Sequence, residues 1–211
     1  PQGLGDILFF LMYVTPYRQL IPEEKIAIVV IKKHFMQLAE LFAGRIDALC
    51  YLDMVDEPMW RHRMTYFYDG IYCSGPQPYL VRAIQNAMGL QEMARAYLPE
   101  LPRIQNMKRL EEEYGLKRGR TVLIAPDAVS CSVEISDEDW VRIAGLCAEA
   151  GFRVLFNTAE KDRFGKYPTV FLPLVETLHL IGVGGNFIGL RSGLCDVMAA
   201  FANVNSLIIY P

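Results

Sequence analysis

The sequence predicts an α/β fold in which parallel strands alternate with helices in two successive units. Short β-branched apolar runs, such as residues 26–31, are typical of parallel strands that are buried on both faces. Patterns of helical period lie between these runs. Near the middle of the chain, prolines and a charged run over residues 108–117 interrupt the alternation. These observations predict two α/β units, residues 1–105 and 106–211, of which the second is a doubly wound parallel sheet.

The first unit contains one complete βαβ pattern. Strands are expected over residues 26–31 and 48–52, with a helix between them that stops at Gly44. The apolar face of that helix comprises Phe35, Leu38, Ala39 and Phe42. Residues 53–75 are rich in aromatic, Met and Arg side chains without a clear period, and a long loop is expected there. A helix that closes at Gly89 follows.

The second unit has a well-marked helix after its first strand. Ser136 is the expected N-cap, acids follow it in the first turn, and Gly151 ends the helix. Its apolar face comprises Trp140, Ile143, Ala144 and Cys147. Strands are expected over residues 121–126, 153–156, 186–190 and 206–210, and further helices over 108–117, 174–181 and 193–202.

Composition limits the class of protein. The net charge of −3 argues against nucleic acid as the main partner, because binding to a phosphate backbone needs a basic excess. The 5 cysteines form no C-x-x-C pair, which indicates reduced thiols in a cytoplasm and no structural zinc site. The longest apolar run covers residues 7–14, far short of the roughly twenty residues that span a bilayer. A cytoplasmic protein is therefore expected, either soluble or peripheral on a membrane surface.

A strand-to-helix turn in the second half indicates phosphate binding. Residues 187–190 read as a strand that turns through Arg191, Ser192 and Gly193 into a helix. The N-terminus of a helix gathers unpaired N–H groups and partial positive charge, and an adjacent arginine adds to that charge. This favours a nucleotide or phosphosugar ligand. The alternative is a small-residue turn that serves packing alone.

The N-terminus carries a second candidate site. Gly3 and Gly5 read as a glycine-rich turn that opens a helix and lets a substrate approach the backbone, with Asp6 at or next to the N-cap. Asp6 is then either a simple cap or a general base that points into a cleft above the sheet. The helix N-terminus stabilises its carboxylate, which weakens the base, although such a group still orients a hydroxyl and takes its proton late.

The order of these motifs resembles glycosyltransferase family 9, the heptosyltransferase-like enzymes of bacteria. In the first half the resemblance is carried by Gly5-Asp6, Thr15-Pro16, Pro22 and the strand over residues 25–31. In the second half it is carried by residues 124–128, the Trp140 helix, residues 174–176 and the turn and helix from Ser192 to Ala200.

The resemblance implies a GT-B architecture, with two Rossmann-like domains facing a cleft. It implies inverting, metal-independent transfer of a sugar from a nucleotide-diphosphate donor, without any cofactor, to a surface-polysaccharide or lipopolysaccharide-type acceptor. It assigns the base role to Asp6, the donor side to Asp127 and the Arg191 turn, and the acceptor side to the domain that contains Gly3 and Gly5. It also implies that the first domain lacks its first strand and that the second is incomplete at its C-terminus.

The donor turn departs from the family pattern. The family has Asp-Ser/Thr-Gly-x-x-His there, whereas this chain has Arg191 at the first position and Asp196 at the last. The lysine usual in the loop before the Trp helix is absent between Ala128 and Ser136. Arg191 is a candidate to supply the missing positive charge. The turn resembles a divergent branch associated with surface-polysaccharide synthesis, so the donor sugar does not follow from the resemblance.

Two further groups have open interpretations. Glu176 is either a hydrogen-bond acceptor for the ribose of a nucleotide or a solvated acid at the start of a helix. Residues 60–68, which include Arg61 and Arg63, mix cations with aromatic rings. They either stack on an acceptor glycan, rest on anionic lipid at the inner membrane, or form a packed loop.

No metal site is expected. Asp137, Glu138 and Asp139 fit a D-x-D pattern, but they occupy the first turn of a capped helix, where acids favour the helix dipole. The three histidines fall in different elements. Two alternatives to a transferase stay open on the same fold: a nucleotide-sugar epimerase, and a nucleotide-sugar-binding protein without catalysis.

Overall fold

The computed structural model describes residues 4–23, 25–42, 46–51, 88–90, 97–98, 100–128 and 135–210. The chain divides into two compact units, Pro1–Pro99 and Glu100–Pro211, and each is described by itself. The two units meet six residues before the domain boundary expected between residues 105 and 106. That the two units are separate domains stays a prediction.

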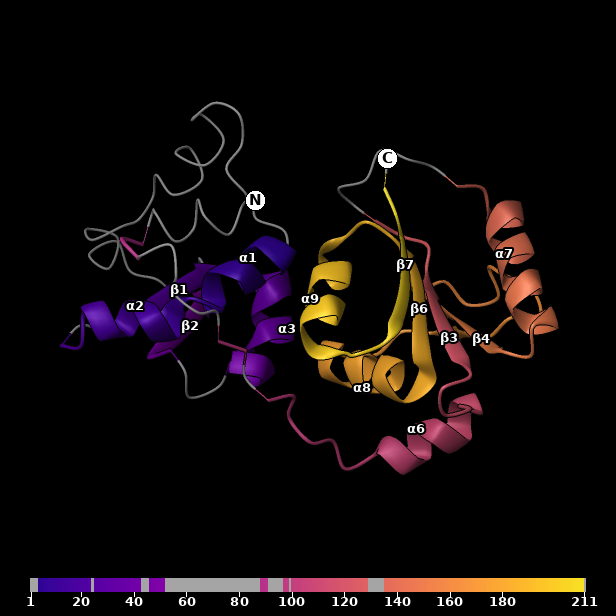
Figure 1. Ribbon diagram of the computed structural model, residues 1–211, viewed down its shortest axis with the longest axis horizontal. Helices are drawn as coiled ribbons and strands as arrows, with labels where there is room; N and C mark the ends of the chain where they lie inside the picture. The colour runs from indigo at the N-terminus through magenta and orange to yellow at the C-terminus, as the bar shows by residue number, and fades with distance from the viewer. Residues whose placement is uncertain are drawn as a thin grey trace. The chain divides into compact units, whose positions relative to one another are not determined.

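The second unit is built on a parallel sheet of five strands (Figure 1). The strands are β3 (Thr121–Ala125), β4 (Arg153–Asn157), β5 (Thr169–Val170), β6 (Gly185–Leu190) and β7 (Asn205–Ile209). Their spatial order is β5-β4-β3-β6-β7, and each neighbouring pair is parallel. The predicted alternation of strands and helices is confirmed, and β5 is an addition to the predicted set.

Helices cover both faces of this sheet. They are α6 (Met107–Tyr114), α7 (Asp137–Glu149), α8 (Leu174–Gly184) and α9 (Gly193–Phe201). In Figure 1, α7 lies on one side of the sheet, and α8 and α9 lie on the other. All four were expected from the sequence. Gly115 ends α6 in the left-handed conformation, with φ of 60°, which a side chain with a Cβ adopts at a cost.

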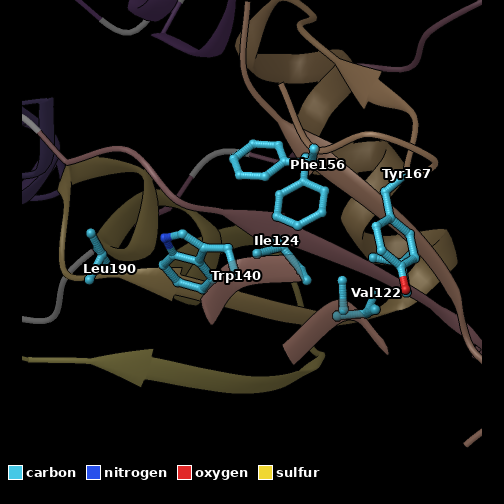
Figure 2. Packing of buried hydrophobic residues seen from close by; sticks show 9 residues of the cluster. Val122, Ile124, Trp140, Phe156, Tyr167 and Leu190 are labelled. Carbon is cyan, nitrogen blue, oxygen red and sulfur yellow. The ribbon is translucent and has the colours of Figure 1, made fainter. Parts of the chain in front are cut away.

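One buried cluster of the second unit forms between α7 and the sheet. All five residues of β3 are buried, as expected for a central parallel strand. The cluster comprises Val122, Ile124, Trp140, Ala144, Val154, Phe156, Phe164, Tyr167 and Leu190. Figure 2 shows Trp140 packed within this cluster, beside Ile124. The rings of Phe156 and Phe164 stack with centroids 3.8 Å apart. The predicted apolar face of α7 is confirmed.

The first unit contains the predicted βαβ pattern. Its elements are α1 (Leu4–Leu11), α2 (Val14–Leu20), β1 (Ala27–Val30), α3 (Lys32–Phe42) and β2 (Ala48–Tyr51). β1 and β2 are parallel, with Ala27 opposite Ala48. The expectation that this strand is buried on both faces is wrong for the described residues. Ile28 and Val30 are buried, whereas Val29 and Ile31 are 36% and 45% exposed, so β1 packs one face only.

The long apolar run near the N-terminus is divided between two helices. α1 ends at Leu11 and α2 begins at Val14, so the run does not form one continuous helix. Within the described part of the chain, no helix has both the length and the apolar character to cross a membrane.

Candidate functional site

The strand order of the second unit creates a topological switch point between β3 and β6. The chain passes from β3 outward to β4 and β5, then returns to β6 and continues to β7. Ligands of open parallel sheets bind where such connections diverge, outside the carboxyl ends of the strands. Ala125 at the end of β3 pairs with Gly189 in β6. Asp127 and the Arg191 turn therefore follow neighbouring strands and leave the sheet at the same edge.

The turn after β6 is held by hydrogen bonds on both sides of Arg191. The Arg191 N–H donates to the Ile209 carbonyl at 2.9 Å, and the buried Cys195 thiol donates to the Leu190 carbonyl at 3.1 Å. Ser192 is the N-cap of α9 in an extended conformation, and its side chain makes no capping hydrogen bond within the described chain. Among the first N–H groups of α9, that of Cys195 donates to the Ser192 carbonyl at 3.0 Å, and none donates to the Ser192 hydroxyl within the described residues. Helix-start N–H groups without a capping side chain are suited to an anionic ligand.

Arg191 is not an isolated positive charge. Its Nη1 lies 2.9 Å from Asp196 Oδ2 and also donates to the Ser192 carbonyl at 2.8 Å. Asp196 therefore compensates part of the positive charge of Arg191, and the role of Arg191 toward a phosphate stays a prediction. The pairing has a simple cause: Asp196 lies in the first turn of α9, which favours an acid and faces the residue before the N-cap.

Asp127 is bound to an arginine that the sequence analysis missed. Arg163 Nη1 donates to Asp127 Oδ1 at 2.8 Å, and Arg163 Nη2 donates to Asp137 Oδ1 at 2.8 Å. The hydrogen bonds from Arg163 hold the pKa of Asp137 below its ordinary value. The sequence does contain a clue to Arg163. This arginine follows the strand β4, and Asp127 and Asp137 follow the neighbouring parallel strand β3, so the three side chains are expected at the same edge of the sheet.

Glu176 also has a partner within the second unit. Its Oε1 accepts a hydrogen bond from Asn106 Nδ2 at 2.8 Å. One turn later, His179 Nε2 lies 2.7 Å from the Pro102 carbonyl, so α8 holds the chain that leads into α6. Glu176 lies in the first turn of α8 and is half-buried. Its role toward a ribose stays a prediction.

The acids of the D-x-D pattern have separate structural partners. Asp137 binds Arg163, whereas Asp139 accepts a hydrogen bond from Ser136 Oγ at 2.9 Å and pairs with Arg142. The Asp139 N–H donates to Ser136 Oγ at 3.1 Å, which confirms the predicted N-cap of α7.

The predicted residues of the first unit are described only in part. α1 covers Leu4–Leu11, so Gly5 and Asp6 lie inside the helix, and the expectation that Gly5 belongs to a turn before it with Asp6 at or next to the N-cap is wrong. The cause is the buried spacing of Leu4, Ile7, Leu8 and Leu11, which starts the helix early. Gly3, Arg61, Arg63 and the side chain of Asp6 lie outside the described residues.

Comparison with known proteins identifies similar structures. No family model matches the chain, and no curated protein does. ADP-heptose lps heptosyltransferase II of E. coli matches with a TM-score of 0.61 and 11% identity, over 100% of this chain and 82% of that one. A family 9 glycosyl transferase from Veillonella parvula matches with a TM-score of 0.67 and 10% identity, over 100% of this chain and 84% of that one.

A third structure extends the likeness to an iron-containing dodecameric enzyme. The glycosyltransferase TibC of enterotoxigenic E. coli matches with a TM-score of 0.65 and 17% identity, over 98% of this chain and 55% of that one. At these identities the likeness is one of fold. The resemblance predicted from the order of the sequence motifs is confirmed at that level: this chain has the α/β fold of solved family 9 glycosyltransferases and heptosyltransferases.

Proposed function

We propose that the protein is an inverting glycosyltransferase that moves a sugar from a nucleotide-diphosphate donor to a glycan or glycolipid acceptor. Structures of the similar E. coli heptosyltransferase WaaC with ADP and with ADP-2-deoxy-2-fluoro heptose support a donor of this class. The proposal includes an acceptor of surface-polysaccharide or lipopolysaccharide type. It also includes a cytoplasmic location, with peripheral contact to the inner membrane.

One observation carries the proposal. The switch point of the second sheet places the Arg191 turn and the start of α9 beside the loop that begins at Asp127. The Ser192 side chain does not cap α9, and Arg191 adjoins the same helix start. Backbone N–H groups and a guanidinium at such a point are suited to a diphosphate.

The chemistry asks for charge stabilisation at this turn. Departure of a nucleoside diphosphate leaves growing negative charge on the phosphate next to the sugar. Fixed N–H dipoles and a fixed arginine stabilise that charge as it forms, so we propose that transfer needs no metal ion. On the acceptor side we assign the general base to Asp6, which takes the proton of the attacking hydroxyl.

The proposal is tested with a panel of nucleotide sugars. Each is first scored for protection of the protein against thermal unfolding, because a ligand that binds the folded state raises its stability. Compounds that protect are then scored for release of nucleoside diphosphate in the presence of acceptor. Protection followed by release supports a transferase. Protection without release favours a binding protein, and no protection by any nucleotide sugar contradicts the proposal.

Arg191→Ala should weaken donor binding by roughly 1.5–3 kcal/mol, the usual effect of losing a charged hydrogen bond. Calorimetric titration with the protecting nucleotide sugar measures the change. Arg142→Ala is the matched control, because it removes an arginine that pairs with an acid in the first turn of α7. Unchanged affinity in a folded Arg191→Ala protein would remove the turn from the site.

A further inference from the structure

Asp196 lies next to the proposed phosphate turn and holds Arg191 through its carboxylate. Asp196 Oδ2 is 2.9 Å from Arg191 Nη1, and the two side chains are 16% and 34% exposed. Because the pair is largely removed from solvent, salt screens it less than an exposed pair. The ion pair with Asp196 therefore restricts the orientation of the Arg191 guanidinium.

The main chain at Arg191 is also fixed. Its N–H donates to Ile209 in β7, and the preceding carbonyl, that of Leu190, accepts from the Cys195 thiol. The side-chain torsions are then the main remaining freedom of Arg191. The contact with Asp196 restricts these torsions, so its carboxylate determines where the guanidinium points.

The contacts leave one edge of the guanidinium for a ligand. Both partners of Arg191, the Ser192 carbonyl and Asp196 Oδ2, are bound by the same nitrogen, Nη1. Within the residues that the structure describes, Nε and Nη2 have no hydrogen-bond partner. A guanidinium is a planar fork that takes two oxygens of a phosphate along one edge, and Nε with Nη2 forms such an edge.

We propose that Asp196 is a positioning residue of the donor site, which directs the Nε–Nη2 edge of Arg191 toward the diphosphate. This inference rests on the proposed function and deepens it. Lysine at position 191 would not replace the arginine, because it has a single charged nitrogen and no second edge to offer a ligand while it pairs with Asp196. Asp196 does not touch the donor in this arrangement and acts through Arg191.

The sign of one substitution separates this role from a simple charge effect. Asp196→Asn removes a negative charge beside an anionic ligand, so a pure field effect would tighten binding. Loss of positioning would weaken it instead. We expect Asp196→Asn to bind about tenfold more weakly, as for a charged hydrogen bond that is no longer aligned.

The test is a double-mutant cycle in the full chain, read by calorimetric titration with ADP, GDP and UDP. Asp196→Asn should weaken binding in the parent protein and should cause no further loss in an Arg191→Ala background, because it acts through that side chain. Asp139→Asn is the matched control: it makes the same change to an acid that pairs with an arginine in the first turn of α7. The control should leave nucleotide affinity unchanged.

The outcomes distinguish the inference from the proposed function. Parent protein that binds none of the three nucleotides contradicts both. If the parent binds while Asp196→Asn binds equally well or more tightly, or if the losses in the cycle add, the inference is overturned and the proposed function stands. If Asp196→Asn does not fold, Asp196→Glu replaces it. Glu keeps the charge but displaces the carboxylate, so positioning predicts a loss of affinity, and unchanged affinity would overturn the inference.

Discussion

At the scale of single residues, Arg163 links two acids that lie in different parts of the second unit. It donates to Asp127 after β3 and to Asp137 at the start of α7, and it follows β4 itself. Its hydrogen bonds lower the pKa of Asp137, because they stabilise the ionised carboxylate. The folded state therefore gains stability from this ion pair only where Asp137 is ionised.

This pKa shift predicts a pH dependence with a defined sign. The Asp137 pKa is lower in the folded than in the unfolded chain, where it is about 3.9. The contribution is fully present above that value and disappears as the pH falls through the folded pKa. The difference in free energy of unfolding between the parent and Asp137→Asn should shrink below about pH 4. Urea unfolding at pH 7 and pH 3 measures it, and an equal difference at both would exclude the ion pair as its source.

Asp6→Asn tests the proposed base. The substitution keeps an oxygen that can accept a hydrogen bond at the start of α1 but removes the proton acceptor. Transfer should fall by about 10²–10⁴-fold, the usual contribution of a positioned general base, with donor affinity little changed. Steady-state rates and nucleotide titration provide the two measurements. A folded variant that transfers sugar at the parent rate would leave Asp6 with a structural role only.

The side-chain partners show what the sequence did not predict. Asp127, Glu176 and Arg191 were placed on the correct elements, because local patterns define strands and helices. The partners of Asp127 and Glu176 are distant in sequence: Arg163 is 36 residues from Asp127, and Asn106 is 70 residues from Glu176. A pattern reports which face of its own element a residue occupies, and it does not report which distant side chain meets that face.

At the scale of elements, the long apolar strands were predictable and the short one was not. β3, β4, β6 and β7 follow from runs of β-branched and apolar residues that are long enough to show their character. β5 has 2 residues, Thr169 and Val170, too few for any period to appear. The glycines near the N-terminus predict a later start for α1, whereas the buried apolar spacing of Leu4, Ile7, Leu8 and Leu11 extends the helix to Leu4.

The N-cap of α7 gives a prediction at this scale. Ser136→Ala removes the oxygen that accepts from the Asp139 N–H, and it should lower the free energy of unfolding by about 1 kcal/mol. Ser136→Asn, which restores an acceptor, should keep most of the parent stability. Chemical denaturation of the three proteins provides the comparison. Equal loss in both variants would show that the hydroxyl, and not capping in general, is required.

At the scale of the whole molecule, structural comparison establishes the fold, whereas the activity is a proposal. The doubly wound second unit was predicted from the alternation of its elements, and the likeness to solved family 9 structures confirms the fold of the chain. The pairing of two such domains across a cleft, which the resemblance to family 9 implies, stays a prediction, because each of the two units is described by itself. The identities of the donor, the acceptor and the general base are tested by the nucleotide-sugar panel and by the substitutions described above.

Metal independence is a prediction about the complete enzyme. If backbone N–H groups and Arg191 stabilise the leaving diphosphate, sugar transfer should continue after the protein is treated with EDTA. The assay is release of nucleoside diphosphate before and after chelation, with thermal unfolding as the control for integrity. Complete loss of transfer that manganese or magnesium restores would reject this mechanism and return Asp137 and Asp139 to consideration as ligands.

Arg163 has a consequence for how this scaffold can change. By binding Asp127 and Asp137 it fixes both ends of the connection between β3 and α7, beside the switch point. Closing a longer loop between fixed ends adds little entropic cost, about 0.6 kcal/mol for each doubling of length. The connection can therefore vary in length and sequence without displacing the strand or the helix. Under the proposed function, different donor sugars would then be accommodated by changes in this connection, while the sheet stays unaltered.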